Sequence, residues 1–407
     1  MGLRWALVDS GPRGWSDPAL STHRPCPVCG SLRARAFLEL ADYQFYADDS
    51  DAPKRMSIRD VQCASCFAAF LNPVYTDVGF RLLFAQAEKS YGATEGRAGE
   101  EVRWLAENGL LNEGAAVLDI GCYDGDLLAL MPQGVRCMGV DIDATAIARG
   151  RQRLGEAAEL VVGDFASFSV STPPDLMTMF HVLEHLPYPV PILNRLREAA
   201  HAGSRLVVEV PVLEGRPTND LVGFFTAQHT THFSRRSLAN CLARGGWRIV
   251  EWLQQPDYNG CRVLCEPTQP DSATVGDPKD AVRVRETLMR WHRAAIDVTH
   301  ATAPLAEAER CIVWGGGMHV EHLYAATPFF QCHPGREYVI VDSDPAKQGG
   351  TWRGIDIRVP AEALSEADAA GVSLLVSSYG SQPEIARAAA ELGVKQIVTL
   401  YDEVSTY

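Results

Sequence analysis

Three features are scarce or missing in this sequence of 407 residues: long hydrophobic runs, positive charge and an even set of cysteines. No apolar run approaches the roughly 18 residues that a transmembrane helix requires. The apolar stretch within Met1–Asp9 is also too short for a secretory signal. We therefore expect a cytoplasmic protein that does not bind to a membrane.

Acidic residues outnumber basic ones, and the formal net charge is -14. Proteins that bind nucleic acids gather basic residues on the face that contacts phosphate groups, so the charge argues against this class of partner. Small molecules are the expected partners, and the oligomeric state is left open. The hydrophobic content of 46% is ordinary for a globular protein, and the length predicts two or three domains.

The cysteines number eleven, and only two pairs have the spacing of a motif. A disulfide framework is therefore not expected, and the thiols should be reduced. The two pairs are Cys26 with Cys29 and Cys63 with Cys66, each a C-x-x-C turn that can point both thiolates at one ion. Four thiolates suit a closed, structural zinc site. A redox-active C-x-x-C is less favoured, because neither pair lies between a thioredoxin-like strand and helix.

A glycine turn follows the apolar strand Val117–Ile120 and precedes an apolar stretch that we expect to be helical. Gly121 and Gly125 allow the backbone to approach a ligand closely, and Asp141 ends a second strand about twenty residues later. A carboxylate at that place can bind both hydroxyls of a ribose. The pattern predicts a nucleoside ligand. We expect it to contact seven residues of these two strand ends: Asp119, Gly121, Cys122, Tyr123, Gly125, Asp141 and Ile142.

The charge of the turn indicates which nucleoside binds. A dinucleotide fingerprint reads G-x-G-x-x-G, whereas this turn places a ring and a carboxylate at its centre, where they would repel a pyrophosphate. Asp119, Asp124 and Asp141 instead suit a ligand with a sulfonium, an ammonium and a ribose. S-adenosylmethionine (SAM) has this combination, so we predict SAM as the cofactor.

With these motifs the chain resembles the class I SAM-dependent methyltransferases. Residues 161–165 resemble the acidic loop that contacts adenine in that family, which implies cofactor contacts for Asp164 and Phe165. Residues 175–186 resemble the fourth strand and the turn after it. From this resemblance we expect His181 beside the cofactor and His185 near the substrate.

The segment from His181 to His185 also spells the H-x-x-E-H motif of an inverted zinc protease. That motif needs one continuous helix, but a strand precedes it here, and Pro187 and Pro189 end any helix after it. A protease is therefore not expected.

Strands alternate with helices through residues 205–211, which predicts a parallel sheet covered on both faces, and two further strands are expected at 247–252 and 261–265. A polar linker from Pro267 to Lys279 and a helix over 282–308 follow. A second strand, glycine turn and helix then begin at Cys311. Val320 replaces the third glycine of a dinucleotide fingerprint, which favours a structural or substrate-shaping role over NAD binding. We expect His319, Glu321 and His322 to lie at a solvated helix start without a metal.

These patterns predict four segments. They are a zinc-binding domain with a lid (1–90), a Rossmann-like methyltransferase core (91–268), a linker with a helix (269–309) and a second Rossmann-like domain (310–407). This order resembles the three-part C-methyltransferases that act on nucleotide-linked deoxysugars. Such enzymes carry a Glu-His pair in the insertion after the fifth strand, whereas here Gln228 precedes His229 and His232 follows.

The predicted function is therefore methyl transfer from SAM to a nucleotide-linked sugar or glycan precursor, on carbon or oxygen. The acceptor must lose a proton, and an imidazole with a pKa near 6.5 suits this task. His229 is the first candidate base and His232 the second, while Gln228 and Tyr91 on the lid are candidate donors to the substrate. Packing of His229 in a polar turn and helix capping by His232 remain the structural alternatives. Two alternative functions also remain: methylation of another natural-product metabolite, and a catalytically silent binding module.

Overall fold

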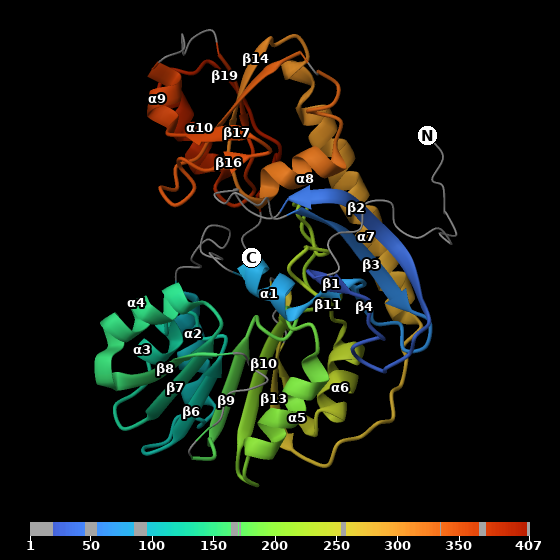
Figure 1. Cartoon of the computed structure of the whole chain (residues 1–407), viewed down its shortest axis with the longest axis vertical. Helices are drawn as coiled ribbons and strands as arrows, with labels where there is room; N and C mark the ends of the chain where they lie inside the picture. Colours follow the sequence, from blue (N-terminus) through green and yellow to red (C-terminus); the bar gives the residue numbers. More distant parts are fainter. Residues whose placement is uncertain are drawn as a thin grey trace.

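The computed structural model describes residues 19–44, 55–84, 96–163, 170, 172–253, 258–333, 335–365 and 372–404. Within these ranges the strands form four sheets, of seven, six, four and two strands (Figure 1). None of the helices in the described ranges combines the length and the apolar character that crossing a membrane requires.

The seven-stranded sheet forms the centre of the predicted core. Its strands are β6 (Ala116–Ile120), β7 (Arg136–Asp141), β8 (Ala158–Val162), β9 (Leu176–Phe180), β10 (Arg205–Pro211), β12 (Trp247–Leu253) and β13 (Gly260–Pro267). Their order across the sheet is β12-β13-β10-β9-β6-β7-β8. Only β13 runs against its neighbours. The order reverses between β6 and β9, and ligands of open α/β sheets bind at the carboxyl ends of the strands at such a point.

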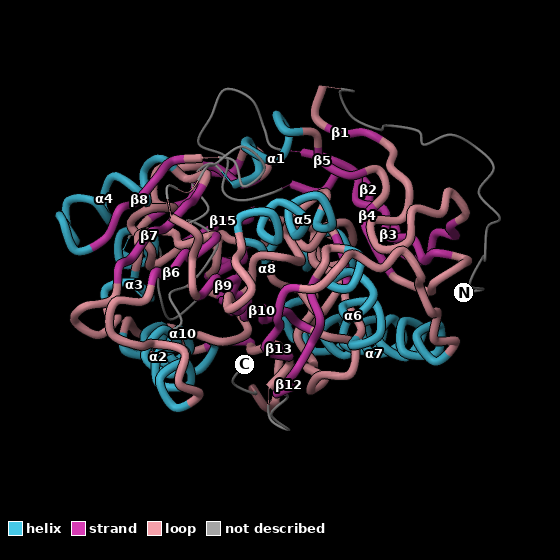
Figure 2. The backbone as a smooth tube through the Cα atoms, turned by 90° about the horizontal axis from the view of Figure 1, so that it is seen from below, coloured by secondary structure: helices cyan, strands magenta, loops and turns pink. Residues whose placement is uncertain are grey.

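Helices cover this sheet as the alternating pattern predicts. They are α2 (Arg97–Glu107), α3 (Asp126–Ala129), α4 (Ala144–Leu154), α5 (Pro189–Ala199) and α6 (Arg235–Arg244). Helix α4 lies beside β8 at the sheet's edge (Figure 2). It begins where Asp143 accepts hydrogen bonds from two backbone N–H groups of the first turn. The helix after the glycine turn, α3, is only four residues long and ends three residues before Pro132.

The N-terminal part is an antiparallel sheet with an unexpected fourth strand. Strands β2 (Ala34–Gln44), β3 (Arg55–Cys63) and β4 (Ala69–Leu71) are consecutive, but β11 (Thr231–His232) comes from the insertion after β10 and pairs with β4. A separate pair, β1 (Ser21–Thr22) and β5 (Val74–Tyr75), precedes α1 (Asp77–Phe84). The insertion after β10 therefore adds an edge strand to the N-terminal sheet.

The predicted linker helix is α7 (Lys279–Ala301), which ends before Pro304. Its apolar side, with Val284, Leu288 and Trp291, packs in one cluster with Leu38 and Ile58 of the N-terminal sheet. Figure 1 shows α7 running beside β2 and β3 and reaching the six-stranded sheet.

The six-stranded sheet is formed by the C-terminal part of the chain. Its strands are β14 (Arg310–Trp314), β15 (Glu337–Val341), β16 (Thr351–Trp352), β17 (Ile355–Arg358), β18 (Ser373–Val376) and β19 (Gln396–Val398). The order is β16-β17-β15-β14-β18-β19, and only β16 is antiparallel to its neighbour. The helices are α8 (Met318–Ala326), α9 (Pro360–Ser365) and α10 (Gln382–Glu391).

The expectation of a solvated start for α8 is wrong. Glu321 and His322 are each 1% exposed, and His319 is also buried. The end of β2 covers them: Tyr43 Oη lies 2.9 Å from His322 Nδ1, and the N–H of Gln44 donates to Glu321 Oε1 at 2.9 Å. The start of α8 is buried because the N-terminal sheet packs against it.

Candidate active site

The glycine turn between β6 and α3 has left-handed backbone, with φ of 75° at Gly121 and 84° at Gly125. A Cβ on Gly121 would lie 2.4 Å from Cγ2 of Val182, and one on Gly125 would lie 2.7 Å from Cδ1 of Leu154. Glycine is therefore required here by backbone conformation and by neighbouring side chains. The space beside Gly121, which we expected to serve a ligand, is taken by Val182.

Asp141 is held at the end of β7 by the turn itself. Its Oδ2 accepts a hydrogen bond from the N–H of Tyr123 at 2.9 Å, and its Oδ1 accepts one from the N–H of Asp143 at 2.8 Å. Burial raises the pKa of Asp141 and outweighs these two hydrogen bonds, which lower it. The carboxylate is thus oriented at the carboxyl end of the sheet, where a ribose would bind.

The side chains of the turn itself point elsewhere. The Tyr123 ring lies under the guanidinium of Arg149, and its hydroxyl accepts a hydrogen bond from Arg149 at 2.9 Å. Cys122 is buried in the core. Asp124 pairs with Arg153 at 3.2 Å. Ile142 is half-buried and packs against the main core.

Asp119 lies inside β6 and is 5% exposed. Its Oδ1 accepts a hydrogen bond of 2.6 Å from the hydroxyl of Thr178 on β9. Burial raises the pKa of Asp119 to about 8, although the Thr178 hydroxyl acts in the opposite direction. Burial therefore favours the protonated form of this side chain.

His181, predicted beside the cofactor, begins the turn after β9 and has a left-handed φ of 55°. Its Nε2 lies 3.1 Å from Glu209 Oε1 and 2.5 Å from Tyr258 Oη, and Tyr258 donates to the same carboxylate oxygen at 2.8 Å. Burial alone would lower the pKa of His181, but Glu184 and Glu209 outweigh it and raise the pKa to about 9. Non-glycine residues with such backbone cluster at functional sites.

The sequence reasoning missed Glu209 and Tyr258. Glu209 is 2% exposed on β10, and it also pairs with the guanidinium of Arg262. Burial opposes its ionisation, yet His181 and Arg262 hold the pKa of Glu209 at about 2. A lone carboxylate in the otherwise apolar segment 206–211 was the available signal, because buried charges are paired.

The structure brings His185, Gln228 and His229 together. His185 Nδ1 lies 3.0 Å from the backbone oxygen of Gln228, and the rings of His185 and His229 are 4.9 Å apart. Burial first, and then repulsion by neighbouring imidazoles, lowers the pKa of His229 well below its usual value. Glu184, which the sequence reasoning also left out, completes this group with its carboxylate. Candidates from two distant segments thus meet beside His181.

His232 lies next to this group, with its ring centroid 6.4 Å from that of His229, but it has a partner of its own. It is 1% exposed, and its Nε2 lies 2.7 Å from Oδ1 of Asp60, a residue of β3 with no exposed surface. It does not cap the next helix either, because Ser234 makes the capping box of α6. Strand β11 carries His232 into the N-terminal sheet, where it has a structural partner.

Three predicted residues, Tyr91, Asp164 and Phe165, lie outside the described residues. The four predicted zinc ligands do come together. The Sγ atoms of Cys26 and Cys66 are 3.6 Å apart, and those of Cys29 and Cys63 are 3.5 Å apart. Tetrahedral bonds of about 2.3 Å to zinc place thiolates about 3.8 Å apart, so this cluster fits a structural zinc ion.

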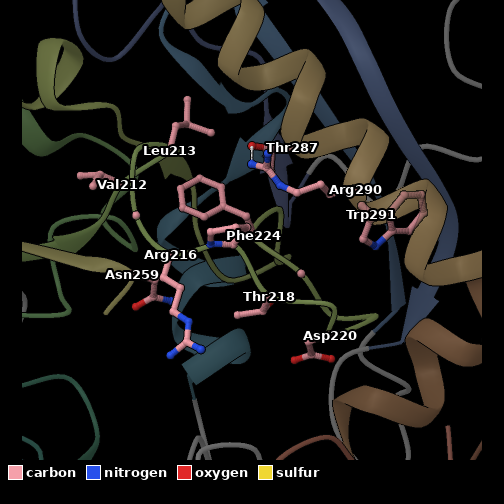
Figure 3. A pocket seen from close by; sticks show the side chains of 13 residues that line it. Val212, Leu213, Arg216, Thr218, Asp220, Phe224, Asn259, Thr287, Arg290 and Trp291 are labelled. Carbon is pink, nitrogen blue, oxygen red and sulfur yellow. Dashed lines mark hydrogen bonds between the residues drawn. The ribbon is translucent and has the colours of Figure 1, made fainter. Parts of the chain in front are cut away.

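A pocket open to solvent is lined by residues of the insertion after β10, by Asn259 and by residues of α7. Figure 3 shows Phe224 in its middle, with Arg290 and Trp291 of α7 on one side and Arg216 and Asn259 on the other. Its lining thus combines aromatic rings with guanidinium groups, which suits a ring-bearing anion.

A family model described as a methyltransferase domain matches residues 94–252. A trans-aconitate 2-methyltransferase from Methylobacterium nodulans is 34% identical over 113 residues, which make up 26% of this chain and 43% of that protein. The chain therefore spans less than half the length of the curated relative that it matches.

Solved structures are also similar to part of the chain. An S-adenosylmethionine-dependent methyltransferase from Clostridium acetobutylicum is 9% identical, with 47% of this chain and 98% of that chain covered at a TM-score of 0.36. The 1,6-didemethyltoxoflavin-N1-methyltransferase of Burkholderia thailandensis is 18% identical, with 51% and 98% covered at a TM-score of 0.41.

Proposed function

We propose that residues 94–252, a class I SAM-dependent methyltransferase domain, transfer a methyl group from SAM to a small-molecule acceptor. The observation that carries this proposal is the oriented carboxylate of Asp141, next to the glycine turn at the point where the strand order reverses. The most specific form of the proposal takes a nucleotide-linked (deoxy)sugar or a related glycan precursor as the acceptor.

In this proposal SAM lies across the carboxyl ends of β6, β7 and β9. Asp141 binds the ribose, Asp119 supports the cationic end, and the backbone of the glycine turn faces the ligand. The resemblance to class I methyltransferases adds Asp164 and Phe165 at the adenine. His181 then lies at the boundary between the cofactor and the acceptor.

The acceptor would lie beyond His181, against His185, Gln228 and His229. The methyl group leaves an activated sulfonium, so the protein must chiefly align the acceptor and prepare its nucleophilic atom. We assign this preparation to His229, because His232 is already bound to Asp60. Gln228 and Tyr91 are the proposed donors to the acceptor.

The pocket around Phe224 would hold the rest of the acceptor. Arg216 and Arg290 suit phosphate oxygens, and the rings of Phe224 and Trp291 suit a base or sugar. The zinc-binding segment (1–90) and the segments 269–309 and 310–407 are proposed to support this site structurally. We do not assign NAD to the last of them, because Val320 stands where a dinucleotide fingerprint has its third glycine, and Lys347 pairs with Asp342 at 3.4 Å.

A small carboxylate is the second candidate acceptor. The curated relative is named for trans-aconitate, and the guanidinium groups that suit a phosphate also suit a carboxylate. This alternative belongs with the wider class of natural-product metabolites that carbon or oxygen methylation can modify.

Two measurements test the proposal. Calorimetry should show saturable binding of SAM with one site per chain, and no binding would favour a catalytically silent module. A panel of nucleotide sugars, free sugars and carboxylic acids with methyl-labelled SAM should then show transfer to a nucleotide sugar. If only carboxylic acids are labelled, the acceptor is a small carboxylate and not a nucleotide sugar.

A further inference from the structure

Three side chains at the acceptor end of the proposed site meet in one place. Glu184, His185 and His229 each offer a ligand atom, and these atoms lie within 4.8 Å of one another. Glu184 and His185 belong to the turn after β9, whereas His229 comes from the insertion after β10. Two imidazoles and one carboxylate are a donor set that binds divalent transition metals with positions left open.

Glu184 brings a buried carboxylate to this place, with the imidazole of His181 as its ion-pair partner. The residue is 1% exposed, and neither carboxylate oxygen accepts a hydrogen bond from the described residues. The nearest imidazole nitrogens are His181 Nδ1 at 3.4 Å and His185 Nε2 at 4.0 Å from Oε1. A buried carboxylate without hydrogen bonds is costly, so a further partner would stabilise it.

The backbone around the group holds two of these side chains in position. The carbonyl of Glu184 accepts a hydrogen bond from the N–H of Thr231 at 3.1 Å. His185 Nδ1 faces the carbonyl of Gln228 at 3.0 Å, and a nitrogen that faces a carbonyl carries the proton. The other nitrogen, Nε2, then has the lone pair. Histidine ligands of metals are oriented in this way by a second hydrogen bond.

We propose that Glu184, His185 and His229 bind one divalent transition-metal ion, such as Mn²⁺, whose open positions take oxygen atoms of the acceptor. The inference rests on the proposed function and specifies the role of His229 as a ligand, where the sequence predicted a general base. Ligand atoms on such an ion lie about 3 Å apart, so these side chains would close by about 1–2 Å. An acceptor with two neighbouring oxygens, such as a vicinal diol, fits the open positions.

The first test uses the zinc-replete full chain, because soft thiolates retain zinc and leave Mn²⁺ to oxygen and nitrogen ligands. The chain is titrated with Mn²⁺ while free Mn²⁺ is counted by electron paramagnetic resonance, with and without SAM. We expect one bound Mn²⁺ per chain, with nitrogen couplings from histidine in the electron spin-echo spectrum. Absence of stoichiometric binding, or bound Mn²⁺ without nitrogen coupling, would overturn the site.

Variants locate the ion. Glu184→Gln keeps the shape of the side chain and His229→Ala removes one imidazole, and each should weaken Mn²⁺ binding at least about tenfold. His201→Ala removes an exposed histidine outside the group and should leave the affinity unchanged. Equal affinities in wild type and Glu184→Gln would refute the assignment, and the wild-type spectrum decides if a variant does not fold.

Calorimetry with SAM on the same samples separates this inference from the proposed function. Binding of SAM without Mn²⁺ binding would leave a methyltransferase in which His229 acts as a metal-free base. If the wild-type protein does not bind SAM, this result would instead contradict the proposed function.

Discussion

At the scale of single residues, burial decides which of the predicted groups carry charge. Asp119 and Asp141 look alike in sequence, yet Asp119 lies inside the sheet with one hydroxyl partner, whereas Asp141 accepts two backbone hydrogen bonds. The pKa of Asp119 rises to about 8 for this reason. A cationic ligand would reverse that shift, because it favours the carboxylate.

This difference predicts that SAM binding releases a proton near pH 7. The affinity for SAM should rise between about pH 6 and pH 8 and then level off, because above its raised pKa Asp119 is already ionised. Calorimetry in buffers of different ionisation enthalpy measures the released proton. Asp119→Asn should abolish the release, and equal release in both proteins would exclude Asp119 as its source.

The same raised pKa links the stability of the ligand-free protein to pH. The folded state binds this proton more tightly than the unfolded state, whose ordinary aspartate pKa is about 3.9. The contribution of Asp119 to the free energy of unfolding is therefore full below about pH 4 and is lost as the pH rises towards 8.

His229 and His232 should differ when each is changed to alanine. His232→Ala leaves Asp60 buried without its partner, so we expect the free energy of unfolding to fall by about 1–3 kcal/mol with SAM affinity retained. His229→Ala should instead lower turnover at least about 100-fold. Urea denaturation and labelled-methyl assays measure the two effects. Unchanged stability of His232→Ala would contradict its structural role.

At the scale of elements, the four cysteines of the predicted zinc site come from two separate turns of the N-terminal part. The thiolates of Cys26 and Cys29 come from a loop before β2, and those of Cys63 and Cys66 come from the end of β3 and its turn. An ion at this place would therefore join two chain segments that the hairpin of β2 and β3 separates in sequence.

We expect metal analysis of the purified protein to find one zinc ion per chain. Cys63→Ser should lower the zinc content and the melting temperature together, because a structural zinc site contributes directly to folding. Cys332→Ser, which changes an exposed cysteine outside the cluster, is the matched control. Absence of stoichiometric zinc from the purified protein would contradict the predicted zinc site.

At the scale of the whole molecule, charged side chains join the N-terminal sheet to the six-stranded one. Arg353 donates to Glu321 Oε2 at 3.0 Å and also contacts Asp42 at 3.2 Å, and Trp352 donates to Glu321 as well. The guanidinium lies 3.9 Å from the ring centre of Tyr324. The contact between Arg353 and Asp42 joins residues that are 311 positions apart in the sequence.

Arg353→Ala should therefore destabilise the protein strongly. It leaves the buried carboxylate of Glu321 without its cation, and breaking such a pair costs about 3–5 kcal/mol. Arg293→Ala breaks an exposed pair with Asp297 and should change the free energy of unfolding by less than about 1 kcal/mol. Chemical denaturation measures both free energies of unfolding. Similar losses in the two variants would contradict a stabilising role of the pair between Arg353 and Glu321.

Local patterns in the sequence determined the alternating strands and helices, the glycine turn, Asp141 and the clustering of the four cysteines. Each of these features depends on residues that are close in the chain or on a recognisable spacing. The local backbone therefore restricts which structures these residues can form. Tertiary structure decided which side chains share a site. Pairing of β11 with β4 moved His232 to Asp60, and packing of β10 against β9 brought Glu209 to His181. Such contacts join distant segments, and no local pattern encodes which partners burial will impose.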